Sequence, residues 1–238
     1  MALDPIPAIQ KNQLLQSLSA ADLAMLEPHL VRQEFPLRME FEKANRPVTA
    51  VYFPEHGIGS VVARTGAEEV EVGVIGRDGM TGHVVMLGND RSPHSVFMQV
   101  AGGGLCMSAD ALRNAIEESP TLRRLLLRYI QAFGIQTAHT ALANARGNLE
   151  ERLARWLLMA HDRLDGDELL LKHSFLSLML GVRRAGVTLA LRELASAGLI
   201  ETKRGCIVIV DREGLEAEAK GMYGTPEREY RRLMRLDA

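Results

Sequence analysis

Residues 171–211 read LKHSFLSLMLGVRRAGVTLALRELASAGLIETKRGCIVIVD, and this stretch decides the fold. Apolar side chains recur at helical spacing on both sides of Gly181, which predicts two short helices, 174–180 and 183–197, joined by a tight turn. Two β-branched runs follow, with Lys203–Gly205 at the tip between them. The pattern is typical of a helix–turn–helix followed by a β-wing.

Positive charge gathers in this stretch although the whole chain is nearly neutral. The 238 residues carry 28 Lys+Arg against 30 Asp+Glu, a formal net charge of −2. Between 172 and 209, however, the chain contains six basic residues and only two acidic ones. Arg183 and Arg184 begin the second helix, where a major-groove helix presents side chains to base edges. Lys203 and Arg204 lie where a wing meets phosphates, so we predict a small DNA-binding face; a solvated helix face and hairpin tip are the alternative.

Upstream of this stretch, the hydrophobic pattern changes twice. Residues 12–34 have helical spacing, and 48–107 contain short β-branched runs separated by glycine-rich turns. Within the second region, Val70, Val72 and Val74 alternate with polar or small residues, as in a half-buried strand. Several short strands at about ten-residue spacing predict a small antiparallel β-barrel or jelly roll.

A new helix opens at Ser119–Pro120, with serine as N-cap and proline at the first helical position, and continues for about 25 residues. Leu122, Leu126, Tyr129 and Phe133 follow alternating steps of four and three residues, which is the spacing of a coiled-coil seam. The same periodicity also fits a helix packed on the chain's own barrel. We expect these four residues to form a dimer seam, with that packing as the alternative.

Several classes of function find no support in the sequence. Cys106 and Cys206 are the only cysteines, too few for a disulfide scaffold or a four-cysteine metal or iron–sulfur site. Without a Gly-x-Ser-x-Gly elbow, a Walker lysine or a dinucleotide-binding glycine motif, we expect no enzyme, catalytic residue, metal site or cofactor. Met1–Pro7 does not resemble a signal peptide, and no run reaches about 18 apolar residues, so we expect a cytoplasmic protein without a membrane partner.

The order of helix, small barrel, long helix and winged helix–turn–helix resembles the CRP/FNR family of transcription regulators over about residues 13–220. The most specific piece is GVRRAGVTLALR at 181–192, and VYFPEHG at 51–57 and the run 70–82 are also similar. The resemblance implies an α+β fold: a jelly-roll, cyclic-nucleotide-binding-like antiparallel β-barrel, a dimerisation helix and a winged helix–turn–helix. The implied boundaries are 1–118 for the effector domain, 119–147 for the dimerisation helix and 148–238 for the DNA-binding domain.

The resemblance also implies a homodimer in which each protomer offers one recognition helix to half of a near-palindromic operator. Arg184 matches the family arginine that reads a guanine. Ala185 and Leu189 replace two other base-reading side chains, a glutamate and an arginine, so the usual operator sequence is not assumed. The residues expected to contact DNA are His173, Ser174, Arg183, Arg184, Thr188, Lys203 and Arg204.

The effector region departs from the family as well. Members that bind cyclic AMP hold the ribose with a Gly-Glu pair and the phosphate with a following arginine. Gly82 and His83 stand at the pair here, and Arg91 or His94 takes the place of the arginine. Because the carboxylate is absent, we do not expect cyclic AMP as the effector, whose identity stays open. Glycines recurring every third residue at 73–82 are read as turns between strands, with an effector pocket beneath them as the alternative.

Two further alternatives concern partners. A cyclic-nucleotide-binding interaction module with little DNA binding is the second functional hypothesis. The charge-rich stretch 226–236 predicts an amphipathic helix, interpreted as a solvated cap on the wing domain. Docking of that helix to RNA polymerase or to the partner protomer is the alternative.

Overall fold

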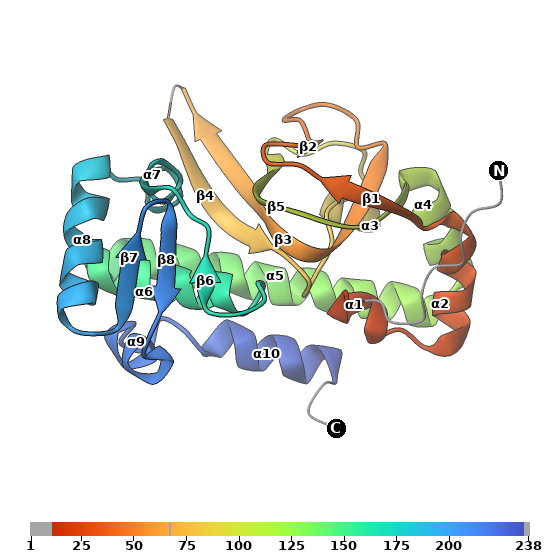
Figure 1. Ribbon diagram of the computed structural model, residues 1–238. Coiled ribbons are helices and arrows are strands. Elements are labelled where there is room, and N and C mark those ends of the chain that lie inside the picture. The colour runs from red at the N-terminus through yellow and green to blue at the C-terminus, as the bar shows by residue number, and fades with distance from the viewer. Residues whose placement is uncertain (1–10, 67, 236–238) are drawn as a thin grey trace.

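The computed structural model describes residues 11–66 and 68–235, so the expectations for Met1–Pro7 and for residue 236 fall outside it. Residues 11–118, called the N-terminal part below, combine short helices with one antiparallel sheet (Figure 1). Its elements are α1 (Gln13–Gln16), α2 (Ala20–Leu26), the 3-10 helix η1 (Glu27–His29), β1 (Val31–Phe35), β2 (Glu40–Glu42), β3 (Ala50–Thr65), β4 (Glu68–Ile75), α3 (His83–Met86), β5 (Ser95–Ser108) and α4 (Ala109–Glu118).

The sheet is open rather than a closed barrel. Its strand order is β1-β5-β3-β4, β2 also pairs with β5, and every pairing is antiparallel. The stretch 54–57 lies in the region where glycine-rich turns between short strands were expected, but it continues strand β3, because register shifts let the strand bend without ending. Gly57 has φ +86°, and a Cβ there would lie 2.7 Å from the Val100 carbonyl oxygen, so the bend requires glycine.

The helix predicted over 12–34 is divided into α1, α2 and η1, and its last residues form β1 instead. Ser19 begins α2 as an N-cap, with its side chain accepting the Asp22 N–H at 3.1 Å. Val31 then pairs with Cys106 at one end of the β1–β5 ladder. The helical spacing of apolar residues therefore did not reveal that Ser19 divides the segment into two helices. It also did not reveal the strand β1, because the strand that pairs with it lies far along the chain.

The C-terminal half confirms the predicted order of long helix, helix–turn–helix and wing. Helix α5 runs beneath the sheet, and the helix–turn–helix lies at its C-terminal end (Figure 1). The elements are α5 (Pro120–Arg146), α6 (Leu149–His161), β6 (Glu168–Leu169), α7 (His173–Leu180), α8 (Arg184–Ser196), β7 (Ile200–Lys203), β8 (Cys206–Ile209), α9 (Arg212–Glu218) and α10 (Thr225–Met234).

Helices α7 and α8 meet at a sharp bend. Gly181 ends α7 in the left-handed conformation, at φ +61°, and the two helices are bent by 103°. Among the residues that the structure describes, no single helix is long and apolar enough to cross a membrane. Of these residues, only α7 and α8 taken together reach that length and composition.

The face of α5 predicted as the dimer seam is buried within the chain itself. Leu122, Leu126 and Tyr129 are 0%, 2% and 4% exposed and belong to the core of the N-terminal part. Phe133 packs against Gly73, where an added Cβ would lie 2.6 Å from its ring. In the single chain this face packs against the sheet above α5, which is the alternative stated for these four residues, and a seam formed by them stays a prediction that no observation supports. An exposed row on the opposite face, called the open stripe, consists of Leu127, Gln131, Gly134, Ala138, Ala141 and Ala145.

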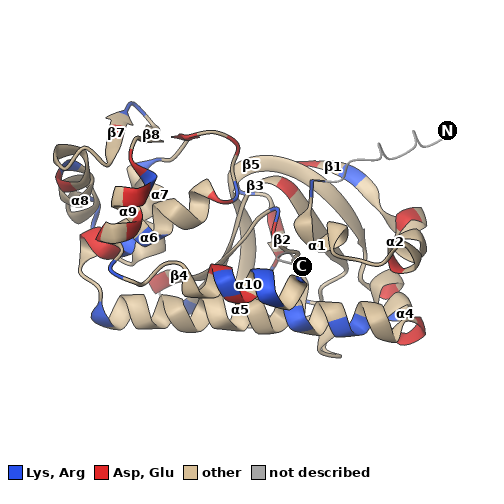
Figure 2. Ribbon diagram, turned by 90° about the horizontal axis from the view of Figure 1, so that it is seen from below, with Lys and Arg blue, Asp and Glu red and all other residues tan. Residues whose placement is uncertain are grey.

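Helix α10 does not cap the wing domain as a solvated helix. It returns along α5 toward the N-terminal part (Figure 1), and its end joins the core there. Leu233 and Met234 are 7% and 3% exposed and share a hydrophobic cluster with Leu14 and Leu15. Basic and acidic residues occupy much of α10 (Figure 2), and Arg228, Arg231 and Arg232 are exposed. The C-terminal half is therefore tied to the N-terminal part at both of its ends.

Candidate functional site

Helix α8 has one buried and one exposed face. Val187 and Leu191 are buried against the winged-helix core, with exposures of 0% and 1%. Arg184, Leu189 and Arg192 point outward, and the Leu189 side chain is 55% exposed, unusual for a large apolar residue. The outward face thus combines cations with an apolar group, both of which can contact base edges.

The arginines at the start of α8 have no side-chain partner in the described part of the chain. Arg183 is the N-cap residue, and no side chain caps the helix, so its first backbone N–H groups are left without an intrahelical partner. Within residues 11–66 and 68–235, the side chains of Arg183, Arg184 and Arg204 make no hydrogen bond or ion pair. Unpaired guanidinium groups beside a helix N-terminus form an arrangement that attracts phosphate.

The other predicted DNA contacts divide into two groups. Ser174 and Lys203 are exposed, and Lys203 makes a solvent-exposed ion pair with Glu168 at 3.2 Å. His173 and Thr188 are partly buried and face each other, with 3.3 Å between the His173 Nδ1 and Thr188 Oγ1 atoms. These two side chains therefore join α7 to α8, which makes them less available to DNA than their alignment suggested.

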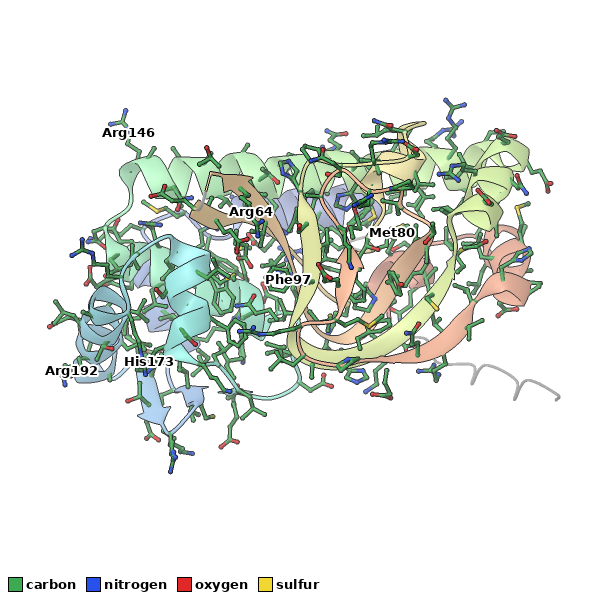
Figure 3. All side chains as sticks on the ribbon, turned by 90° about the horizontal axis from the view of Figure 1, so that it is seen from above. Arg64, Met80, Phe97, Arg146, His173 and Arg192 are labelled. Atoms are coloured by element: carbon green, nitrogen blue, oxygen red, sulfur yellow. The ribbon has the colours of Figure 1, made fainter. Side chains whose placement is uncertain are left out.

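All seven residues lie at one end of the molecule. Figure 3 shows His173 and Arg192 together there, far from Met80 in the N-terminal part. The tip between β7 and β8 is basic in Figure 2. A groove of about 740 Å³ separates the start of α8 from the hairpin formed by β3 and β4, and its charged lining residues are Arg64, Glu68, Glu69, Arg152 and Arg183. Helix α8 thus begins beside a part of the sheet that carries both signs of charge.

The effector loop, residues 76–94, is closed by side chains of its own chain. The Gly82 N–H donates to Glu42 Oε1 at 2.7 Å, and Gly82 has φ +80°. The His83 Nε2 atom lies 3.2 Å from Tyr129 Oη, and its ring centroid lies 4.2 Å from that of Phe133. Burial lowers the pKa of His83 to about 4, so the ring is neutral at neutral pH. The loop presents a neutral, engaged imidazole where the resemblance implied a free carboxylate.

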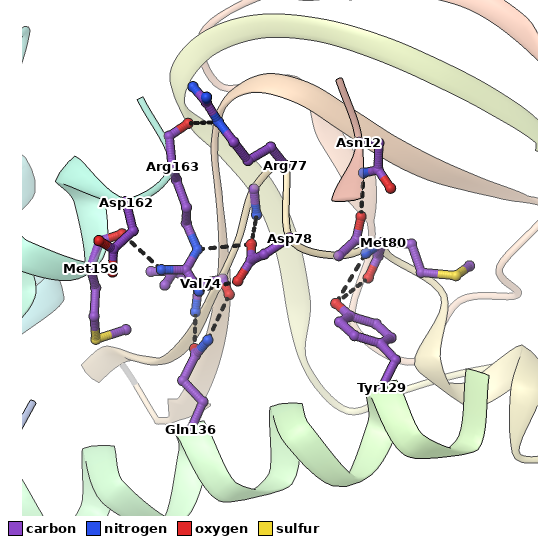
Figure 4. Close-up of polar contacts among 12 residues, drawn as sticks. Asn12, Val74, Arg77, Asp78, Met80, Tyr129, Gln136, Met159, Asp162 and Arg163 are labelled. Carbon is purple, nitrogen blue, oxygen red and sulfur yellow. Dashed lines mark hydrogen bonds and ion pairs between the residues drawn. The ribbon is translucent and has the colours of Figure 1, made fainter. Parts of the chain in front are cut away.

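Tyr129 fixes this loop to α5. Its hydroxyl accepts the Met80 N–H and donates to the Met80 carbonyl oxygen, each at 3.0 Å (Figure 4). Sequence reasoning missed this role because Tyr129 stood in a heptad row and was assigned to the seam. It also missed Glu42, for which the sequence offered no signal.

Arg91 and His94 do not join Gly82 and His83. The exposed Arg91 guanidinium binds its neighbour Asp90 through two hydrogen bonds of 2.9 Å. None of the three cavities described in the molecule is lined by any of these four residues. No group of three or more His, Cys, Asp or Glu side chains in the described part of the chain is arranged to hold a metal ion.

Comparison with known proteins agrees with this arrangement. Residues 151–218 match the family model of the Crp-like helix-turn-helix domain. No curated protein matches the chain in sequence.

Solved structures match nearly the whole of their own chains. FixK2 from Bradyrhizobium japonicum superimposes with a TM-score of 0.67 at 16% identity, covering 79% of this chain and 96% of its own. A CRP-family transcriptional regulator from Thermus thermophilus gives 0.64 at 18% identity, covering 79% and 97%. The c-di-GMP-responsive global regulator CLP from Xanthomonas campestris gives 0.59 at 18% identity, covering 80% and 99%. At these identities the likeness shows the fold.

Proposed function

We propose that this chain, which carries a Crp-like helix-turn-helix domain within the fold of CRP/FNR transcription regulators, is a homodimeric regulator that binds a specific, near-palindromic DNA site. The observation that carries the proposal is the set of unpaired guanidinium groups of Arg183, Arg184 and Arg204 at the start of α8 and the tip of the wing. Side chains of structural ion pairs would have partners, whereas a DNA-binding face keeps its cations free for phosphates and bases.

The exposed face of α8 supports a particular kind of base recognition. Arg184 can place its planar fork against the O6 and N7 atoms of guanine. Leu189 stands further along the same exposed face, where an apolar side chain can contact the methyl group of thymine. We therefore expect each half-site to contain a guanine and a thymine read by these two residues.

The open stripe of α5 supports the homodimer. Its six residues follow steps of four and three, which keep one face of a helix turned toward a parallel or antiparallel partner. Gly134, Ala138, Ala141 and Ala145 are small, so two helix backbones can approach closely along them. The dimer seam therefore moves from the predicted face to the opposite face of the same helix.

The effector loop supports a regulator that does not respond to cyclic AMP. The groups that would hold a ribose and a phosphate are engaged, since His83 contacts Tyr129 and Arg91 binds Asp90. The effector, if it reaches this loop, has to displace side chains that are already packed.

Selection of bound fragments from a random DNA pool tests the proposal. The expected result is an enriched sequence with two-fold symmetry and half-sites one helical turn apart, bound with an affinity that falls steeply as salt is raised. Enrichment without symmetry, or no enrichment at low salt, would reject the regulator and favour an interaction module with little DNA binding.

Sedimentation of a stripe variant tests the dimer separately. Ala138→Arg places a charge in the middle of the open stripe, so we expect a monomer at concentrations where the parent chain is dimeric. Arg146→Glu, an exposed charge change at the end of the same helix and off the stripe, serves as the control and is expected to stay dimeric (Figure 3). A dimeric Ala138→Arg variant would place the interface elsewhere.

A further inference from the structure

A cavity of about 280 Å³ lies where the N-terminal part, α5, the end of α6 and α10 meet. This volume lies just below the range of about 300–1,000 Å³ that is typical of small-molecule sites. Val74, Ala132 and Phe133 give the junction cavity an apolar wall, and Glu227, Tyr230 and Arg231 of α10 form its roof. The junction cavity is therefore bounded by both halves of the molecule at once.

The glycines spaced three apart explain why the walls of this cavity can assemble. A Cβ at Gly73 would lie 2.6 Å from the Phe133 ring, and one at Gly79 would lie 2.1 Å from Tyr129 Oη. At Gly76 it would meet the Arg163 side chain at 2.8 Å. Phe133, Tyr129 and Arg163 all line the cavity. The glycine repeat thus admits three cavity-lining side chains from α5 and the end of α6, rather than only forming turns between strands.

Most polar groups around the cavity are already paired (Figure 4). Arg163 binds Asp78 through two hydrogen bonds and donates to the Met159 carbonyl oxygen at 2.7 Å. Gln136 bridges the backbone of Val74, accepting its N–H at 2.8 Å and donating to its carbonyl oxygen at 3.3 Å. These hydrogen bonds hold the cavity wall in place. They leave few unused donors or acceptors on that side for a ligand.

Two groups on α10 still have capacity for a ligand. The Tyr230 hydroxyl is buried and has no hydrogen-bond partner among residues 11–66 and 68–235, which is costly unless something occupies the cavity. Glu227 accepts the Gly224 N–H at 2.7 Å through one carboxylate oxygen, Oε2, and its other oxygen has no hydrogen bond among the described residues. A ligand can therefore satisfy one hydroxyl and one carboxylate oxygen.

The charge of the lining selects the ligand further. Asp78 is paired with Arg163, and Asp162 is paired with Arg212 at 2.8 Å, so Glu227 is the carboxylate of the lining that can accept a further hydrogen bond. An ammonium group would donate a charge-assisted hydrogen bond to Glu227, whereas a negatively charged ligand would be repelled by it. The apolar wall suits a flat ring.

We infer that the junction cavity is a binding site for a small aromatic molecule carrying a hydroxyl or an amine, neutral or positively charged, held by Tyr230 and Glu227 under α10. Asp78 of the effector loop lines the cavity, but the predicted pocket residues Gly82, His83, Arg91 and His94 do not. Binding alone does not depend on the proposed function. Its use as an effector site, through α10, rests on that function.

Binding is tested with three probes of matched size: tyramine, p-cresol and 4-hydroxyphenylacetate. Calorimetric titration of the full chain at neutral pH is expected to give saturable binding of tyramine and p-cresol. Tyramine should bind at least about tenfold more tightly than the anionic 4-hydroxyphenylacetate, because Glu227 attracts the ammonium and repels the carboxylate. No saturable binding of tyramine or p-cresol up to about 10 mM, or equal affinity for the cation and the anion, would overturn the inference.

Two conservative variants locate the bound probe. Tyr230→Phe removes only the hydroxyl and should weaken both tyramine and p-cresol about fivefold. Glu227→Gln keeps an acceptor for the Gly224 N–H and should weaken tyramine about tenfold while p-cresol stays within about twofold. Glu229→Gln, on the same helix but paired with Arg232 outside the cavity, is the control and should leave both probes unchanged. Binding that neither cavity variant alters would place the probe elsewhere and reject the site.

The effector role is measured separately from the site. DNA affinity without any probe tests the proposed function, and probe binding without DNA tests the cavity. If both hold, saturating tyramine is expected to change the DNA affinity at least about threefold, because the roof of the cavity belongs to the DNA-binding half. An unchanged DNA affinity would leave a ligand site that is not regulatory and would reject the effector role alone.

Discussion

The effector loop and the helix–turn–helix are both glycine-containing turns that lead into a short helix, yet their polar side chains are arranged in opposite ways. In the loop, His83 and the backbone of Met80 are engaged by Tyr129, and Arg91 binds Asp90. In the helix–turn–helix, Arg183 and Arg184 are exposed and without side-chain partners among the described residues. This contrast fits the proposal that the helix–turn–helix binds DNA and that the loop does not hold cyclic AMP.

The family resemblance therefore predicts the arrangement of side chains well in the helix–turn–helix and poorly in the loop. For the helix–turn–helix, the local pattern of glycine, arginine and buried valine is sufficient to predict which side chains are exposed. Few residues from elsewhere in the chain contact that face. For the loop, the outcome depends on Tyr129 and Phe133 from a helix distant in sequence.

Removing the unpaired arginines at the start of α8 should remove most of the DNA binding that we propose for the helix–turn–helix. Arg183→Ala combined with Arg184→Ala is expected to weaken operator binding about 1,000-fold and to lower the salt dependence, because base and phosphate contacts are lost together. Arg192→Ala, an exposed change later on the same helix, is the matched control and should cost only a few-fold. Fluorescence anisotropy with the selected operator measures both; equal effects would show that α8 does not dock by its N-terminus.

Substitutions in the packed loop should lower the free energy of unfolding and should not remove contacts to DNA. Gly79→Ala is expected to lower the free energy of unfolding by about 3 kcal/mol, because the new methyl group overlaps the Tyr129 hydroxyl. Adding Tyr129→Phe should restore part of this loss. Asn114→Ala, an exposed change on helix α4, is the control and should be neutral or stabilising by at most about 1 kcal/mol. Urea denaturation measures all three.

The contact between the two halves should respond to pH through Glu71. This buried carboxyl accepts hydrogen bonds from Ser60 and from Trp156 Nε1 at 2.7 Å, yet burial raises its pKa from 4.5 to about 7. The folded chain therefore holds the proton more tightly than the unfolded chain, and its contribution to stability falls as pH rises from about 4.5 to about 7.

The variant Glu71→Gln removes that titration. Relative to the parent chain, its free energy of unfolding should rise by up to about 3 kcal/mol across this window. Glu68→Gln, exposed on the same strand, is the control and should show no such trend. A constant difference between Glu71→Gln and the parent chain from pH 4.5 to 7 would contradict the assignment.

The apolar group on α8 should affect specificity more than affinity. Leu189→Ala is expected to reduce discrimination at one thymine of the half-site about fivefold, because the methyl contact is lost while the arginines remain. A repeated DNA selection with the variant measures the change. Unaltered preference at every position would remove Leu189 from base recognition.

Cyclic AMP is expected to produce no effect. With His83 neutral and Arg91 bound to Asp90, calorimetric titration should show no binding tighter than about 1 mM. Specific micromolar binding would mean that the loop opens at little cost, and the contrast between the two regions would fail.

The elements most accurately predicted from the sequence are those whose signals are local. Ser119–Pro120 marked the start of α5, and Gly181 marked the turn between the two helices of the helix–turn–helix. Helical periodicity alone did not reveal which partner covers a face, so Tyr129 was assigned to a dimer and α10 to the solvent. The open sheet and the junction cavity likewise depend on contacts between segments far apart in the chain, for which the sequence offered no local signal.

Helix α10 also has a consequence for how the chain assembles during synthesis. N-terminal domains generally fold first as a chain leaves the ribosome. Here Leu14 and Leu15 belong to a core that Leu233 and Met234 complete. The part that is translated first is therefore finished last, and a nascent chain keeps some of that core open until its DNA-binding half has been made.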